Sequence, residues 1–182
     1  MQMRAPLQIQ SIIKAMTDVV LPAIDPDNKL AQEQARLVLG SLALIAKQLP
    51  LQYRYDCDEL ARLEAFCQSL QSLAQGGTET TGALAALALE LREAGVQSAS
   101  PEEIEQRVRN LRQLSGAVIT AVYVDGSSAA RKDVRAAVLA MSKEQVLRDR
   151  SWVLSQGWEG DPKSIPPIEQ LLGIAADVPA SV

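Results

Sequence analysis

Apolar residues recur every three or four positions through most of the chain, with polar residues between them. The clearest stripe follows spacings of 4, 3, 4, 3 and 4, at Ile104, Val108, Leu111, Ser115, Val118 and Val122. This spacing places the stripe on one face of a helix. Ser100-Pro101-Glu102-Glu103 has the form of a capping box, which predicts that the helix begins there. Residues 117–124 are rich in β-branched side chains and could form a strand, but the unbroken stripe favours a helix.

The same pattern predicts six helices, separated by proline, glycine and short polar connectors. Their expected ranges are 6–21, 26–48, 57–75, 78–94, 101–124 and 128–156. The residues expected to cap or start helices are Asp25, Asp56, Thr78, and Ser127 or Ser128. The sequence therefore predicts an all-α fold, a bundle of about six helices.

The helix expected over 26–48 is the most hydrophobic of the six. One stripe on it holds Leu30, Leu37 and Leu44, and a second, on another face, holds Leu39, Leu42, Ala46 and Leu49. A helix that is apolar on two faces lies either at the centre of a fold or at an interface between subunits. We expect it to be the structural centre, and we expect the apolar surface left over to drive self-association as a homodimer.

Residues 157–182 differ in character from the rest of the chain. Regular structure is interrupted there by Gly157, Gly160, Pro162, Pro166, Pro167 and Pro179. Ile165, Ile168, Leu171 and Leu172 still give this tail apolar surface to bury. The tail could therefore pack on the bundle and cover the leftover apolar surface within one chain, as an alternative to a dimer, or it could be partly mobile. The predicted organisation is a helical domain over 1–156 and a C-terminal tail over 157–182, with a short helical turn near 167–172.

The composition narrows the chemistry available to the chain. Its 182 residues include no histidine, one Phe, three Tyr and two Trp, so the core is expected to be aliphatic. Without imidazole, the commonest general base and transition-metal ligand are missing, and we expect neither a metal site nor a cofactor. The net charge of −4 gives no general attraction for nucleic acid or an anionic membrane. A signal peptide and a transmembrane stretch are not evident, and the predicted location is cytoplasmic.

Few residues are candidates for chemistry. Asp56, Asp58 and Glu59 could bind a divalent cation, although acids at a helix start more often complement its dipole. Cys57 lacks a histidine partner and has acidic neighbours, so we expect an unreactive thiol. Cys67 lies on an apolar stripe and is expected in the core. If one helix carries both cysteines, they are about 15 Å apart, too far for a disulfide.

Basic residues gather on both sides of the turn between the fifth and sixth expected helices. Such a group could bind a phosphate or an acidic partner. Alternatively, it could be a solvent-exposed face whose basic side chains pair with nearby acidic residues. The residues are Arg107, Arg109, Arg112, Arg131, Lys132 and Arg135. Because aromatic residues are not interleaved with them, a nucleic-acid surface is not expected.

The stretch 20–26, Val-Leu-Pro-Ala-Ile-Asp-Pro, is followed by Asn-Lys-Leu-Ala at 28–31 and Ala-Arg-Leu-Val at 35–38. With these motifs, residues 10–63 resemble the N-terminal helices of a family of small bacterial helical proteins of unknown function. Members of that family are often encoded beside acyl-CoA dehydrogenases and aminoglycoside-phosphotransferase-like kinases. The resemblance implies a helical fold and a metabolic neighbourhood, and it transfers no active-site residue.

Three functions follow from these observations. The first is a binding or accessory protein that acts through apolar helix surfaces, as a homodimer or on a partner protein. The second is a small-molecule carrier with an aliphatic pocket between helices for an acyl or sterol-like ligand. The third is an enzyme that uses carboxylates and arginines alone.

Overall fold

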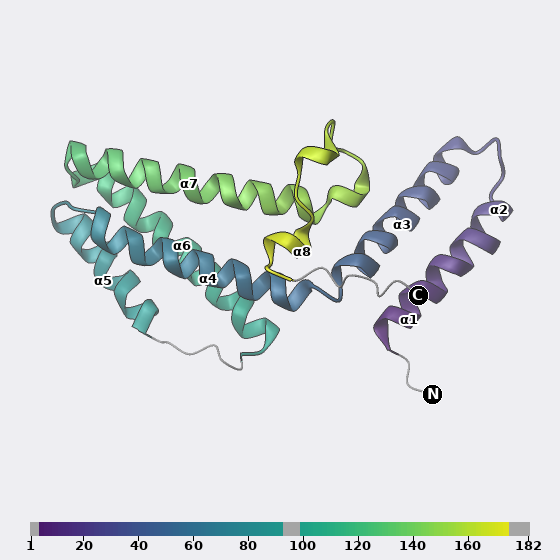
Figure 1. Cartoon of the computed structure of the whole chain (residues 1–182), viewed down its shortest axis with the longest axis horizontal. Helices are drawn as coiled ribbons and strands as arrows, with labels where there is room; N and C mark the ends of the chain where they lie inside the picture. The colour runs from purple at the N-terminus through teal and green to yellow at the C-terminus, as the bar shows by residue number, and fades with distance from the viewer. Residues whose placement is uncertain (1–3, 93–98, 175–182) are drawn as a thin grey trace, which may run out of the picture. The chain divides into compact units, whose positions relative to one another are not determined.

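The structure of the chain is a computed structural model, and it describes residues 4–92 and 99–174. Of the residues that the structure describes, 82% are helical and none is in a strand (Figure 1). The predicted all-α class is confirmed. Circular dichroism should accordingly show a helix content well above 60% of residues and no β signal.

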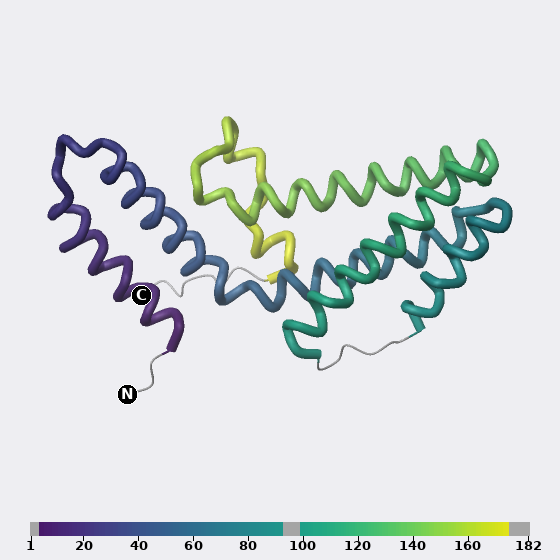
Figure 2. Tube along the Cα trace, turned by 180° about the vertical axis from the view of Figure 1, so that it is seen from behind, coloured from purple at the N-terminus to yellow at the C-terminus, as the bar shows by residue number. Residues whose placement is uncertain are grey.

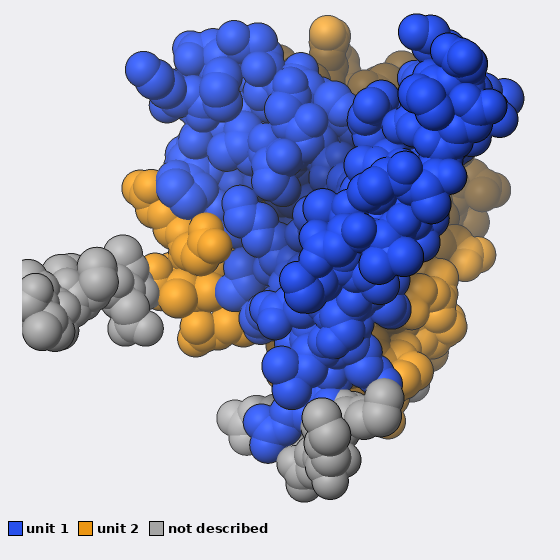
Figure 3. Space-filling model, turned by 90° about the vertical axis from the view of Figure 1, so that its right-hand side faces the viewer, with its two compact units in different colours: residues 1–52, 149–168 blue, residues 53–148, 169–182 orange. Residues whose placement is uncertain are grey.

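The chain forms two compact units, which are coloured separately in Figure 3. The first consists of residues 1–52 and 149–168, and the second of residues 53–148 and 169–182. The sequence predicted a boundary at residue 157 instead. Segment 149–168 belongs to the first unit and forms hydrogen bonds with the helix of residues 29–48. These contacts join residues more than 100 positions apart, so no local sequence pattern predicts them.

The second unit holds the hydrophobic core. Its helices are α4 (Gln52–Leu73), α5 (Thr78–Arg92), α6 (Pro101–Asp125) and most of α7 (Ser128–Trp152), together with residues 169–171 of the short α8 (Ile168–Leu171). The core residues are almost all aliphatic: Leu60, Leu63, Cys67, Leu70, Ala74, Leu87, Ile104, Val108, Leu111, Val118, Val122, Ala130 and Val134. The stripe that predicted the 101–124 helix is therefore the one that faces the core.

Local signals placed some helix starts correctly. Ser100 and Glu103 form the predicted capping box, with the Ser100 hydroxyl accepting from the Glu103 amide at 3.2 Å. Because α6 continues unbroken to Asp125, the strand alternative for 117–124 is wrong. Ser127 caps α7, since its hydroxyl accepts from the Ala130 amide at 3.1 Å.

Two predicted caps are wrong. Asp56 lies inside α4, which begins four residues earlier at Gln52. Asp25 does not cap α3 (Lys29–Gln48). Its carboxylate accepts from the Asp27 amide in a local turn, and Asn28 caps the helix by accepting from the Ala31 amide. Asn and Asp are equally good caps, so the sequence did not distinguish between them.

Asp125, at the end of α6, caps the start of α5. Its carboxylate accepts hydrogen bonds from the Glu79 amide at 2.8 Å and from the Thr80 hydroxyl. The two glycines before α5 make room for this contact: a Cβ at Gly77 would lie 2.8 Å from a carboxylate oxygen of Asp125, and one at Gly76 would lie 2.3 Å from the Thr80 hydroxyl. The hydrogen bond from Thr80, followed by those from the backbone amides, lowers the pKa of the Asp125 carboxyl.

We expect the stabilisation from Asp125 to depend on pH. Because its pKa is lower when folded than the ordinary 3.8, the contribution is complete above that value and is lost as the pH falls through the folded pKa. The Tm of the wild type should exceed that of Asp125→Ala most near pH 7, and the gap should narrow below about pH 4. A gap that is constant from pH 7 to 2 would contradict the charged cap.

The first unit is built on a helical hairpin. α1 (Ala5–Ala15) continues through η1 (Met16–Val20), a π-helical turn that is wider than an α-helical turn, into α2 (Leu21–Ala23). α3 then runs back beside α1 (Figures 1 and 2). The wider turn comes just before Pro22, whose nitrogen cannot donate a hydrogen bond to the preceding turn. The predicted helix over 6–21 is thus confirmed with a local irregularity.

The segment 149–168 is attached to the C-terminal half of α3. The side-chain amide of Gln48 donates to the Trp152 carbonyl at 3.1 Å, and that of Gln156 donates to the Gly40 carbonyl at 3.3 Å. Its own fold includes two short turns, η2 (Leu154–Gln156) and η3 (Pro162–Ser164). The apolar tail residue Ile165 is buried, as its sequence context predicted.

The prediction that the helix over 26–48 is the structural centre is wrong. Ala35 is the one buried residue of α3, and Leu37 is 57% exposed. The pattern identified two apolar faces correctly, but it cannot show which face another element covers. The core belongs instead to α4, α5, α6 and α7, whose apolar stripes face one another.

Candidate functional site

The outer side of α3 is an exposed apolar face. It consists of Leu30, Leu37, Val38, Ile45 and Leu49, and we call it the hairpin face. Exposure runs from 69% at Leu30 to 38% at Leu49. These positions recur at helical spacing, so they lie along one side of the helix over about 28 Å.

The hairpin face carries no charge. The polar residues that fall within it, Gln34 and Ser41, are neutral, and the charged residues of α3 flank it. The neighbouring side of α3 contains the buried Ala35, one turn from Val38, and contacts with α3 leave Ile9 and Ile13 of α1 and Met16 of the following turn partly covered. The hairpin therefore has an interior of its own and a second, outer apolar side.

The predicted basic patch is divided by the fold. Arg107, Arg109 and Arg112 lie in the first half of α6, and each is paired with a carboxylate: Arg107 with Glu64 at 2.8 Å, Arg109 with Glu105, and Arg112 with Glu59. These guanidinium groups are neutralised by residues of the chain itself.

Arg131, Lys132 and Arg135 lie in the first turns of α7, next to the other end of α6. The Arg131 side chain donates to the Val122 carbonyl at 3.2 Å. Arg112 is 13 residues before the end of α6, about 20 Å along the helix axis. The six residues thus form two groups at different levels of the unit, and the structure does not bring them together as one site.

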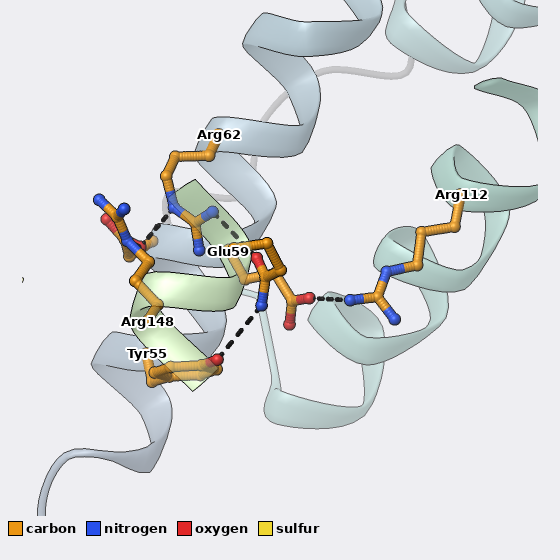
Figure 4. Close-up of polar contacts among 7 residues, drawn as sticks. Tyr55, Glu59, Arg62, Arg112 and Arg148 are labelled. Carbon is orange, nitrogen blue, oxygen red and sulfur yellow. Dashed lines mark hydrogen bonds and ion pairs between the residues drawn. The ribbon is translucent and has the colours of Figure 1, made fainter. Parts of the chain in front are cut away.

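A polar network connects α4 to α7 in the second unit (Figure 4). Asp58 accepts from Arg62 at 2.7 Å and from Arg148 at 2.9 Å. Arg62 also donates to the Gln145 side chain at 3.0 Å, and Gln145 donates to the Tyr55 hydroxyl at 3.3 Å. One nitrogen of Arg62, Nη2, is buried without an acceptor among the described residues.

This network explains the acidic cluster that the sequence singled out. Asp58 and Glu59 are held in ion pairs with arginines, which leaves them poorly placed as cation ligands. Within residues 4–92 and 99–174, no group of three or more metal-ligating side chains comes together. The spacing of Asp58 and Arg62, four residues on one helix, could have predicted their pair. The contribution of Arg148 could not be predicted, because it lies 90 residues away.

Asp58 should contribute more to stability than an exposed acidic residue does. Replacing it with Ala leaves Arg62 and Arg148, both mostly buried, without their carboxylate, and we expect a loss of about 2 kcal/mol in the free energy of unfolding. Glu105→Ala is the matched control, because Glu105 and its partner Arg109 are both exposed. This substitution should lower the free energy of unfolding by less than about 0.5 kcal/mol. Equal losses in chemical denaturation would contradict the network's role.

The two cysteines differ in environment, and both are free thiols. Cys67 is fully buried, as predicted, and burial raises the pKa of its thiol to about 11. The thiolate is the reactive form, and at pH 8 about one Cys67 molecule in a thousand carries it. Cys57 is partly exposed on the same helix, so a small alkylating reagent can reach it although the chain has no histidine to activate it as a nucleophile.

In the native protein, iodoacetamide at pH 8 should label Cys57 and leave Cys67 unmodified. After denaturation both should react, which mass spectrometry of the intact chain can count. Cys57→Ser is the control and should take up no label while folded. Labelling of Cys67 at the rate of Cys57 would show that this part of the core opens readily.

The described helices include none that is both long enough and apolar enough to cross a membrane. Comparison of the chain with protein-family models, with curated proteins and with solved structures gave no match. The resemblance seen in residues 10–63 stays a prediction.

Proposed function

We propose that the chain is a binding or accessory protein that docks another protein on the hairpin face. The observation that supports the proposal is the set of large apolar side chains that α3 leaves exposed, from Leu30 to Leu49. Contiguous apolar patches of this kind are rare on monomers and typical of interaction sites. In keeping with the sequence prediction, the proposal places the protein in the cytoplasm.

The chemistry of the face favours a helical protein surface as the partner. Its apolar residues recur at spacings of seven, as at Leu30 and Leu37 or Val38 and Ile45, which is the pattern of ridges on helices that pack side by side. The hairpin face contains no charged side chain that could bind a charged ligand. The ionisable groups of the second unit that could do catalysis, Asp58 with Arg62 and Glu59 with Arg112, are already bound to one another.

Photo-crosslinking tests this proposal. The photoreactive residue p-benzoylphenylalanine replaces Val38 on the hairpin face in one variant and Leu139 on α7 in a control. Leu139 is 51% exposed, close to the 47% of Val38, but belongs to the other unit. After irradiation in cells, position 38 should give a discrete adduct with a protein and position 139 should give none. Equal yields at both positions would contradict a dedicated binding face.

A further inference from the structure

The hairpin that runs from α1 through η1 and α2 to α3 buries very little of its own surface (Figure 1). Among residues 4–48, Ala35 is the one residue that is buried, and its side chain is a single methyl group. Ile9, Ile13 and Met16, in the interior of the hairpin, are covered only in part. Because most of the stability of a helix in a protein comes from the apolar face that it buries, the hairpin has little to hold it closed.

The second unit differs from the hairpin in this respect. α6 alone buries seven residues along one face, from Ile104 to Val122, and α4 buries five. Leu87 of α5 and Val134 of α7 are fully buried in the same cluster. The chain therefore combines a helical unit that has a continuous core with a helical hairpin that has almost none.

Local interactions in the hairpin do not replace the missing core. α1 has eleven residues, and helices shorter than about 12–15 residues are marginal in water on their own. The wider turn η1 interrupts the regular hydrogen bonding that follows α1, and α3 carries glycine, a weak helix former, at position 40. The ion pair of Lys14 with Asp18 is exposed and adds little. Each helix of the hairpin therefore depends on its contact with the other.

Segment 149–168 supports the hairpin at one end. Its hydrogen bonds with Gly40 and Gln48 are both in the C-terminal half of α3. In the other half, the side-chain amide of Gln32 donates to the Ile24 carbonyl at 2.9 Å, which joins α3 to the hairpin's own turn. α1 and the N-terminal half of α3 can therefore separate without breaking the hydrogen bonds to segment 149–168.

We propose that the hairpin opens and closes as a unit of its own while the core of α4, α5, α6 and α7 stays folded. In the open state α1 no longer lies against α3, and the backbone hydrogen bonds of α1 and of the N-terminal half of α3 break. Elements with few buried apolar contacts open at a lower free energy than the core does. The opening is a property of the single chain, and its consequence rests on the proposed function: a partner that binds the closed hairpin holds it closed, because a ligand stabilises the state that it binds.

Hydrogen exchange of the full chain, followed by mass spectrometry at low protein concentration, tests this inference. Relative to their intrinsic rates, the amides of residues 9–20 and 32–38 should exchange at least about 100-fold faster than those of residues 104–122. Ala35→Gly weakens the hairpin and should speed exchange in its two segments by about fivefold, with no change over 104–122. Ile104→Val is the matched control. It removes one methyl group from the core and should speed exchange over 104–122 by about three- to tenfold, with no change in the hairpin.

Other outcomes overturn the inference. Relative exchange rates of the hairpin and of α6 that agree within about tenfold would mean that the chain opens as one unit. Equal effects of Ile104→Val in both regions, or an Ala35→Gly variant whose hairpin exchanges at the wild-type rate, would mean the same. These results leave the photo-crosslinking at position 38 untouched, so the proposed function stands if this inference fails. Conversely, equal crosslinking yields at positions 38 and 139 would remove the partner and leave the separate opening in place.

Discussion

Leu70→Ala should lower the free energy of unfolding by about 2–5 kcal/mol, whereas Leu37→Ala should lower it by less than about 1 kcal/mol. Leu70 is fully buried in the core of the second unit, so its truncation leaves a cavity. Leu37 is 57% exposed, so its truncation removes little that the single chain buries. If the helix over 26–48 were the structural centre, as the sequence predicted, Leu37→Ala would instead show the full loss of a buried leucine.

The two losses are best measured by urea unfolding followed by circular dichroism. Both tryptophans, Trp152 and Trp158, belong to the first unit, so their fluorescence would not follow the core of the second unit. A low protein concentration keeps the contribution of self-association small. A loss at Leu37 that equals the loss at Leu70 under these conditions would show that α3 is covered within one chain.

Leu37→Asp combined with Ile45→Asp should weaken self-association by at least about 100-fold. Both residues lie on the hairpin face, and an unpaired carboxylate in an apolar interface is costly to bury. The helix content should not change, because both positions are exposed in the single chain. The control is Leu139→Asp with Val146→Asp on α7, where the exposed fractions are 51% and 54% and no loss of association is expected.

Analytical ultracentrifugation of the two double variants separates the alternatives. Association lost in the α3 variant and kept in the α7 variant supports the hairpin face. Loss in both variants would indicate that any added charge disperses the protein, which would contradict a specific face. Retention in the α3 variant would place the interface elsewhere on the chain.

Sequence reasoning succeeded where the determinants are local. The capping box of Ser100 and Glu103 spans four residues, and the stripe from Ile104 to Val122 lies on one helix, so both could be predicted. The short helical turn near residue 168 was predicted for the same reason. The two apolar faces of the helix over 26–48 were also evident from their spacing.

The parts that could not be predicted depend on residues far apart in the chain. Asp125 caps α5 across 46 residues, and Arg148 reaches Asp58 across 90. The ion pairs of Arg107 and Arg112 could not be predicted because their partners, Glu64 and Glu59, lie on another helix, whereas Glu105 lies on the same helix as Arg109. The prediction that α3 is buried was wrong for the same reason. An apolar stripe shows that a helix face is suited to burial, but tertiary packing decides which element, if any, lies against it.

Light scattering of the full chain over a dilution series shows whether the chain associates with itself through the hairpin face. We expect a molar mass of twice the 19.6 kDa of one chain at high concentration, falling toward 19.6 kDa on dilution. The Leu37→Asp, Ile45→Asp variant should give 19.6 kDa throughout. A wild-type mass of 19.6 kDa at every concentration would contradict the account.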